Sequence, residues 1–162
     1  MRVRDLMTRS VASVSSRQSL SEAARSMWDC DCGAVPVTEP GSDRVIGMIT
    51  DRDICIATWS RDQPPSSIPI AEVMSRELFY CTPDQSISSV ESLMRSRRVR
   101  RIPVLDGSQL LVGILSLADI VTLAQRTGAP SAASDLAATE IAATLANICQ
   151  PHQVGSTEAR AF

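Results

Sequence analysis

The feature of this sequence that most constrains its fold is an internal repeat. Residues 3–59 reappear as residues 70–125, at a separation of 67 residues that falls to 66 near the end of each copy. One extra residue between positions 39 and 44 of the first copy accounts for the change, and we expect a hairpin tip there. A repeat of this length indicates two copies of one supersecondary unit that bury their apolar faces together.

The repeat divides the chain of 162 residues into four predicted parts. The segment between the copies contains Pro64-Pro65 and is typical of a linker. The predicted parts are repeat one (1–59), the linker (60–69), repeat two (70–125) and a C-terminal Ala-rich helix with a disordered tail (126–162).

Each repeat contains the same pattern of elements. An extended segment (10–15 or 77–82) precedes a helix, and a second helix follows two strands joined by a turn. Ser19 and Glu22 form a capping-box pattern at the start of the first helix. The predicted strands are 34–38 and 45–50 in repeat one, and 101–105 and 110–115 in repeat two. We predict an α/β (α+β) fold of two β-α-β-β-α repeats packed sheet to sheet, because about 55 residues are marginal alone.

The composition excludes several classes of protein. A net charge of −2 gives no general attraction to nucleic acids or anionic membranes, and an aromatic content of 3% leaves few side chains for stacking on single-stranded bases. No apolar run approaches the roughly 18 to 20 residues of a membrane span. The five cysteines are odd in number, and the first residues lack the apolar region of a secretory signal. We therefore expect a cytoplasmic protein.

Catalytic and metal-binding patterns are weak. His152, the only histidine, lies in the tail, so neither repeat offers a Ser-His or Cys-His pair. The Cys30-x-Cys32 spacing has no second Cys or His pair nearby and does not predict a zinc site. We predict a protein that is not an enzyme and needs no metal or cofactor.

Each repeat's second strand ends in a hydroxyl residue, and a carboxylate follows three residues later. These pairs are Thr50 with Asp53 and Ser116 with Asp119. A hydroxyl beside the unpaired amides of a helix start favours a phosphate, and a carboxylate can accept hydrogen bonds from vicinal ribose hydroxyls. The pattern therefore suits a nucleotide. It is also an ordinary helix cap with an acidic third residue, and the two roles can coexist.

The repeats resemble a tandem pair of CBS domains, the small regulatory module named after cystathionine β-synthase. Both strand-to-helix segments, 47–54 and 113–120, fit the family signature G-h-h-[ST]-x-x-D-h, in which h is apolar. Residues 33–37 and 100–104 also fit the family pattern. The resemblance implies a non-catalytic sensor of an adenosine-containing ligand such as AMP, ADP or ATP, or in some members NAD or S-adenosylmethionine.

The resemblance also places ligands in clefts between the two repeats. Family members pack the base against apolar strand residues, matched here by Val35, Pro36, Ile102 and Pro103. Ser15 and Thr82 match positions whose polar atoms often contact the base or the sugar.

A cluster of arginines distinguishes the two predicted sites. The cluster consists of Arg95, Arg97, Arg98, Arg100 and Arg101. The resemblance implies a basic side chain in the cleft at positions 100 and 101, whereas the matching segment 31–34 of repeat one supplies no cation. We expect Ser116, Asp119 and Arg101 to favour a phosphorylated ligand, and the site of Thr50 and Asp53 to be weaker, empty or suited to a less anionic one.

The tail bears on assembly and on the rival functions. We predict a helix over 134–149 whose apolar stripe must be buried on its own body or on a partner; the stripe is Leu136, Ile141, Leu145 and Ile148. Residues 151–162 are predicted to be disordered. The resemblance implies a homodimer formed through helices. The alternative functions are a ligand-free structural or adaptor protein that docks a client through this helix, and a nucleic-acid binder that uses the arginines.

Overall fold

The computed structural model describes the backbone of residues 1–126 and 132–149. It describes the side chains of residues 1–122 and 141–149. It is a mixed α+β structure with small sheets and five α-helices in the described part, as the sequence predicts. Within these residues, no helix is both long and apolar enough to cross a membrane.

Repeat one forms a three-stranded sheet with one helix after its first strand and one after its last. The first two strands pair in parallel and the second pairs antiparallel with the third. In chain order the elements are β1 (Val14–Ser15), α1 (Leu20–Asp29), β2 (Ala34–Thr38), β3 (Val45–Thr50) and α2 (Asp51–Arg61). The predicted capping box begins α1, where the backbone N–H of Ser19 donates to Glu22 over 2.8 Å.

Repeat two contains the same hairpin and the same two helices, followed by one further helix. Its extended segment makes a single parallel bridge, between Cys81 and Val104, in place of a strand. The elements are α3 (Ile87–Arg97), β4 (Arg101–Leu105), β5 (Leu111–Ser116), α4 (Leu117–Arg126) and α5 (Ala132–Cys149). Three short 3-10 turns complete the description: η1 (Val3–Asp5), η2 (Pro65–Ser67) and η3 (Ile70–Glu72).

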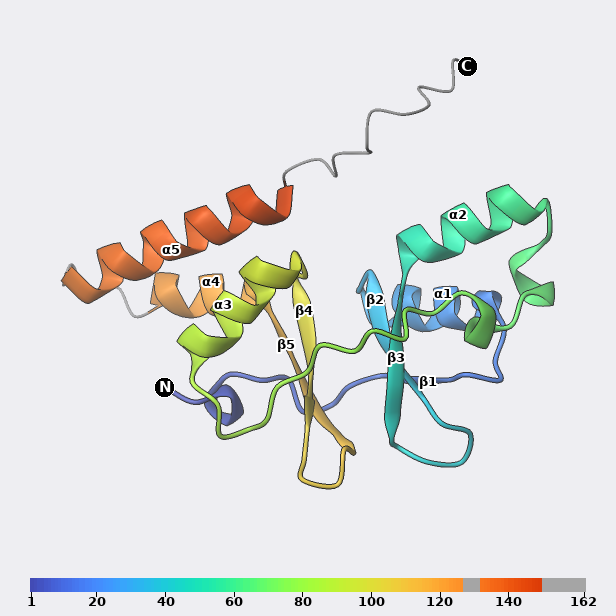
Figure 1. Cartoon of the computed structure of the whole chain (residues 1–162), viewed down its shortest axis with the longest axis horizontal. Helices are drawn as coiled ribbons and strands as arrows, with labels where there is room; N and C mark the ends of the chain where they lie inside the picture. The colour runs from blue at the N-terminus through green and yellow to red at the C-terminus, as the bar shows by residue number, and fades with distance from the viewer. Residues whose placement is uncertain (127–131, 150–162) are drawn as a thin grey trace, which may run out of the picture.

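The two repeats are related by local geometry as well as by sequence. Each hairpin has a register shift at the same place, after Val37 in β2 and after Val104 in β4. The left-handed residues Asp31 and Arg98, with φ of 48° and 54°, lie between helix and strand at matching positions. Figure 1 shows the two hairpins side by side in the middle, with α1 and α2 at one end and α3, α4 and α5 at the other.

The repeats exchange their first segments. Val3 and Met7 are buried in the core of repeat two, whereas Ile70 and Met74 are buried in the core of repeat one. Two of the antiparallel bridges that fix the exchange join Thr8 to Ile114 and Ser75 to Met48. Their N–H···O distances lie between 2.9 and 3.1 Å. Each apolar core therefore includes residues from the start of the other repeat.

Glycines of the family signature make room for the exchanged segments. A Cβ atom at Gly47 would collide with the carbonyl oxygen of Ser75. At Gly113 it would lie 2.7 Å from the sulfur of Met7 and 3.0 Å from the carbonyl oxygen of Thr8. The glycines thus permit the backbone bridges between the repeats.

Gly47→Ala tests this interlock. We expect it to lower the free energy of unfolding by about 1–3 kcal/mol, because the added methyl meets backbone that is held by two hydrogen bonds. Gly107→Ala is the matched control, since nothing lies within 4 Å of its added Cβ, and it should change stability by less than about 0.5 kcal/mol. Urea unfolding of both variants measures the difference, and equal stability would contradict the interlock.

Helix α5 packs against repeat two. Ile141 is buried in that repeat's core, Ile148 is partly buried against it, and Leu145 remains 40% exposed. The hydroxyl of Thr144 is buried; it accepts a hydrogen bond from Arg95 over 2.8 Å and donates one to Glu91 over 3.3 Å. Ile141 and Ile148 of the predicted stripe are therefore used on the protein's own body. The Leu136 side chain and residues 151–162 lie outside the described residues.

The five thiols differ in reactivity because one of them is in the core. Cys81 is buried, and this burial raises the pKa of its thiol to about 12. We expect iodoacetamide at pH 8 to alkylate the exposed Cys30, Cys55 and Cys149 in the native protein and to leave Cys81 unmodified. Peptide mass spectrometry checks this, with protein unfolded in guanidinium as the control. Native labelling of Cys81 at the rate of Cys55 would show that this core is open.

Candidate functional site

The pair Thr50 and Asp53 forms a reciprocal cap at the start of α2. The backbone N–H and the hydroxyl of Thr50 donate to Oδ2 of Asp53 over 2.9 and 2.7 Å. In return, the N–H of Asp53 donates to the Thr50 hydroxyl oxygen over 3.1 Å. The structural interpretation of this motif as a helix cap is therefore confirmed.

The pair Ser116 and Asp119 repeats this geometry at α4. The corresponding distances are 2.8, 2.7 and 3.2 Å. In both pairs the cap uses only Oδ2, and no described residue donates a hydrogen bond to Oδ1 of Asp53 or Asp119. All four residues are half-buried. Each cap thus leaves one carboxylate oxygen for a hydrogen-bond donor from outside the protein.

A cleft of about 300 Å³, here called the Thr50 cleft, contains the first pair. Ala34 and Met48 of repeat one form one part of its lining. Ser75 and Phe79 come from the exchanged segment at the start of repeat two. Repeat two also contributes the segment Arg98, Val99, Arg100 and Arg101 to the lining.

A cleft of about 210 Å³, here called the Ser116 cleft, contains the second pair. Its lining is largely apolar and comes from both repeats: Val11, Ala12, Val35, Pro36 and Ile114. Cys30 and Cys32 also line it, at the positions that in repeat two are Arg97 and Val99. Arg101 is the cation that this cleft shares with the Thr50 cleft.

The structure brings most of the predicted site residues to these clefts. Ser116, Asp119, Arg101, Val35 and Pro36 lie together in the Ser116 cleft, and Thr50 and Asp53 lie in the other. The remaining four are not among the residues that line either cleft: Ser15, Thr82, Ile102 and Pro103. Ile102 is fully buried in the core of repeat two.

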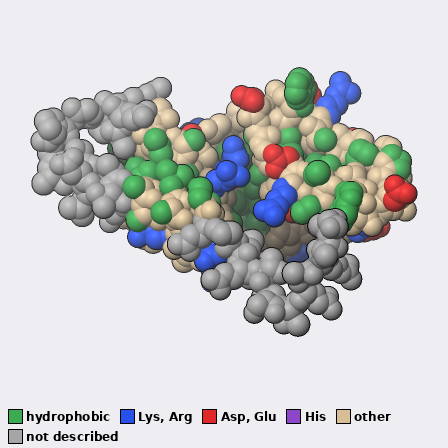
Figure 2. All heavy atoms as spheres, turned by 90° about the horizontal axis from the view of Figure 1, so that it is seen from above, with side chains coloured by type: hydrophobic (Ala, Val, Ile, Leu, Met, Phe, Trp, Pro, Cys, Tyr) green, Lys and Arg blue, Asp and Glu red, His purple; other side chains and the backbone are tan. Residues whose placement is uncertain are grey.

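Members of the arginine cluster have different roles. Arg95 binds Thr144 of α5, and the guanidinium of Arg97 lies 4.9 Å from the centre of the Phe79 ring. Arg98, Arg100 and Arg101 line the Thr50 cleft, which belongs to the hydroxyl and carboxylate pair of the other repeat. Figure 2 shows basic side chains gathered around the hollow between the two repeats.

The sequence signature of the CBS domain matches residues 3–59 and 70–126. The chain belongs to the CBS domain family. CBS domain pairs are regulatory modules, and this chain contains one such pair.

Curated relatives match over most of their length. The CBS domain-containing protein YhcV of Bacillus subtilis is 41% identical over 118 residues, which are 73% of this chain and 81% of that protein. Hypoxic response protein 1 of Mycobacterium tuberculosis is 35% identical over 117 residues, or 72% of this chain and 80% of that protein.

Solved structures share the fold. Hypoxic Response Protein I, crystallised with two coordinated zinc ions, has a TM-score of 0.69 and 34% identity, covering 75% of this chain and 98% of that one. The CBS domain pair of protein MJ0100, in complex with 5′-methylthioadenosine and S-adenosylmethionine, has a TM-score of 0.70 and 23% identity over 78% of this chain and 98% of that one. In the described part of this chain, no group of three or more His, Cys, Asp or Glu side chains could hold a metal ion.

Sequence reasoning missed the cleft residues at the start of each CBS repeat. Thr8 and Ser10 line the Ser116 cleft, and Ser75 and Phe79 line the Thr50 cleft. The repeated starts Leu6-Met7-Thr8 and Val73-Met74-Ser75 were a signal for them. That signal does not reveal which repeat each start packs against, because the exchange is a tertiary contact.

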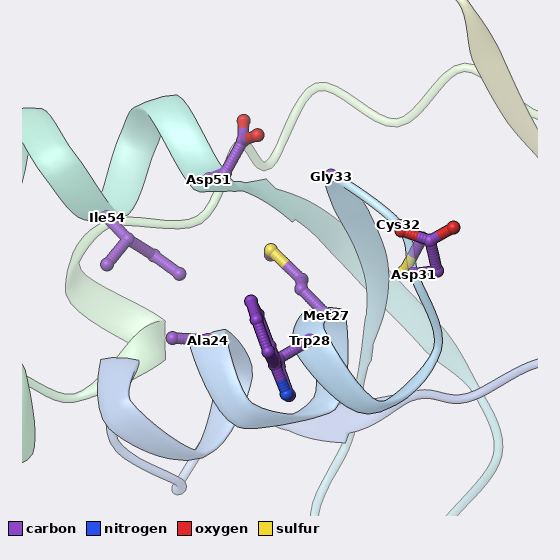
Figure 3. Close-up of a pocket in the computed structure, with 8 residues that line it drawn as sticks. All are labelled: Ala24, Met27, Trp28, Asp31, Cys32, Gly33, Asp51 and Ile54. Carbon is purple, nitrogen blue, oxygen red and sulfur yellow. The ribbon is translucent and has the colours of Figure 1, made fainter.

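A third hollow, of about 460 Å³, lies on CBS repeat one beside both clefts; it shares Gly33 and Asp51 with the Thr50 cleft and Cys32 with the Ser116 cleft. Figure 3 shows Met27 and Trp28 of α1 and Ile54 of α2 beside it. Ala24 and Trp28 of this hollow correspond to Glu91 and Arg95 of repeat two, which bind α5. The place that α5 covers on repeat two is therefore open on repeat one.

Proposed function

We propose that this CBS pair is a non-catalytic regulator that binds adenosine-containing ligands, including AMP, ADP or ATP, in the clefts between its repeats. The observation that carries the proposal is that no described residue donates a hydrogen bond to Oδ1 of Asp53 or Asp119, two half-buried residues that each lie in a cleft beside a hydroxyl. A carboxylate oxygen in that position suits a ribose hydroxyl, because it only accepts hydrogen bonds.

The clefts also supply surfaces for an adenine base. In the Ser116 cleft the base would pack on Val35, Pro36 and Ile114. In the Thr50 cleft it would pack on Met48 and Phe79. The complex of the MJ0100 pair with adenosine derivatives gives a precedent for such ligands in this fold.

The exchange of segments gives ligand binding a route to regulation. A ligand in either cleft would contact residues of both repeats and of an exchanged segment, such as Ser75 or Thr8. Such a ligand favours the arrangement of repeats that best fits it, and it therefore shifts the population toward that arrangement. We propose that this shift is the signal, as an energy or metabolite sensor requires.

The double variant Asp53→Asn with Asp119→Asn tests the ligand role. Asparagine can still accept the capping hydrogen bonds, so folding should persist while the charged ribose acceptor is lost. We expect AMP or ATP at millimolar concentration to raise the melting temperature of the wild-type protein and to leave that of the variant unchanged.

Asp43→Asn, in the exposed β2–β3 turn, is the matched control and should behave as the wild type. A wild-type protein whose melting temperature responds to none of AMP, ATP, NAD and S-adenosylmethionine would refute the sensor and favour the structural alternative. A full shift retained by the double variant would refute the role of the carboxylates.

We also propose that two copies associate through the α1 and α2 face of repeat one. Trp28 and Trp59 are 86% and 74% exposed, and Ile56 is also exposed. Because α5 covers the matching face of repeat two, we propose that the second copy binds the open face of repeat one. The five free thiols accord with a proposed location in the reducing cytoplasm.

Trp28→Ser with Trp59→Ser tests the dimer. We expect the wild type to sediment as a dimer at micromolar concentration and the variant as a monomer. The chain has two tryptophans, both on this face, so wild-type fluorescence should shift to longer wavelength on dilution. Leu110→Ser, which replaces an exposed leucine outside this face, is the control. A monomeric wild type with no such shift would contradict the interface.

The adaptor alternative has less support from α5. Ile141 and Thr144 are buried against repeat two, so they are not free to bind a client. Leu145 is the member of the described stripe that remains exposed.

A further inference from the structure

The two clefts differ in the segment that the opposite repeat contributes. At the Thr50 cleft this segment is Arg98-Val99-Arg100-Arg101. At the Ser116 cleft the matching segment contributes Cys32 and Ala34. The arginine-rich segment of repeat two therefore lines the cleft of Thr50 and Asp53. Through Arg101 it also lines the cleft of Ser116 and Asp119.

Three arginines of the Thr50 cleft have side chains without a polar partner in the part of the chain that the structure describes. No described residue forms a side-chain hydrogen bond or ion pair with Arg98, Arg100 or Arg101. Arg52 is a fourth arginine in the lining. The acidic side chains there are Asp51, Asp53 and Glu77. Four arginines and three carboxylates give this lining a net charge of +1, since a hydrogen bond from a ribose does not neutralise Asp53, and this excess of positive charge favours an anion.

The Ser116 cleft has a different balance. Arg101 and Asp119 are its charged residues, and most of its other side chains are apolar or small. A single guanidinium that is shared with the neighbouring cleft can neutralise one phosphate at most. This cleft is therefore suited to an adenosine group with little negative charge.

A groove of about 600 Å³ extends the basic surface beyond the Thr50 cleft. Arg100, Arg101, Gly33 and Asp51 line both the groove and the cleft. The groove continues along the first turn of α4, at Ser116, Leu117 and Ala118. A chain of phosphates has room to run from the cleft along the guanidinium groups. Each guanidinium group can bind two oxygens of one phosphate.

We propose that the Thr50 cleft binds the polyphosphate form of an adenine nucleotide, and that the Ser116 cleft binds an adenosine derivative with one phosphate or none. This inference rests on the proposed function and reverses the preference expected from the sequence. Arg98 and Arg100 bind the terminal phosphates, and Asp53 holds the ribose.

Isothermal titration with ATP and with adenosine tests the assignment. The test variant is Arg98→Asn with Arg100→Gln, because asparagine tolerates the left-handed backbone at position 98. The matched control is Arg17→Gln with Arg25→Gln, which removes two arginines from exposed positions outside both clefts. A third variant, Asp119→Asn, reports on the Ser116 cleft.

The expected result is a loss of ATP affinity of tenfold or more in the Arg98 and Arg100 variant, with adenosine affinity changed less than twofold. Asp119→Asn should weaken adenosine binding and spare ATP. ATP affinity that survives the arginine variant, or that is lost in Asp119→Asn instead, would overturn the assignment while the proposed function stands. A wild-type protein that binds neither probe would overturn both.

Discussion

Two of the backbone bridges between the repeats hold the start of each repeat against the core of the other. One joins Thr8 to Ile114 and the other joins Ser75 to Met48, and each places the start of one repeat against the last strand of the other. Neither apolar core is complete without the exchanged residues, such as Met7 and Met74. Since a unit of about 55 residues buries too little surface to be stable alone, the exchange makes the pair the folding unit.

The same exchange makes each cleft composite. The Thr50 cleft takes its capping pair from repeat one, its Ser75 from the exchanged segment and three of its four arginines from the segment 98–101 of repeat two. A ligand there would touch three separate stretches of chain. Regulation by a ligand requires unequal affinity for two arrangements, and a composite cleft provides it, because its shape depends on how the repeats are placed.

Much of the fold could be predicted from the sequence, because the signals are local. The cap of Ser19 and Glu22, the strand 34–38 and the helix after Thr50 follow from patterns within a few residues. The extended segments were harder: β1 has two residues, and in repeat two a single bridge at Cys81 replaces it. The segment predicted as 110–115 is a strand at Leu111–Ser116. The resemblance implied a cleft position for Arg100, but the placement of Arg98 and Arg100 beside Thr50 and Asp53 of the other repeat depends on tertiary contacts, which no local pattern encodes.

The central claim is that the two composite clefts hold adenosine groups through Asp53 and Asp119, with the polyphosphate chain on the arginine side. A crystal structure of the protein grown with ATP and adenosine tests it most directly. The account predicts a ribose within hydrogen-bond distance of Oδ1 of Asp53, with the triphosphate at Arg98 and Arg100, and adenosine beside Asp119. Electron density for the triphosphate beside Cys30 and Cys32, or for either ligand outside the clefts, would contradict it.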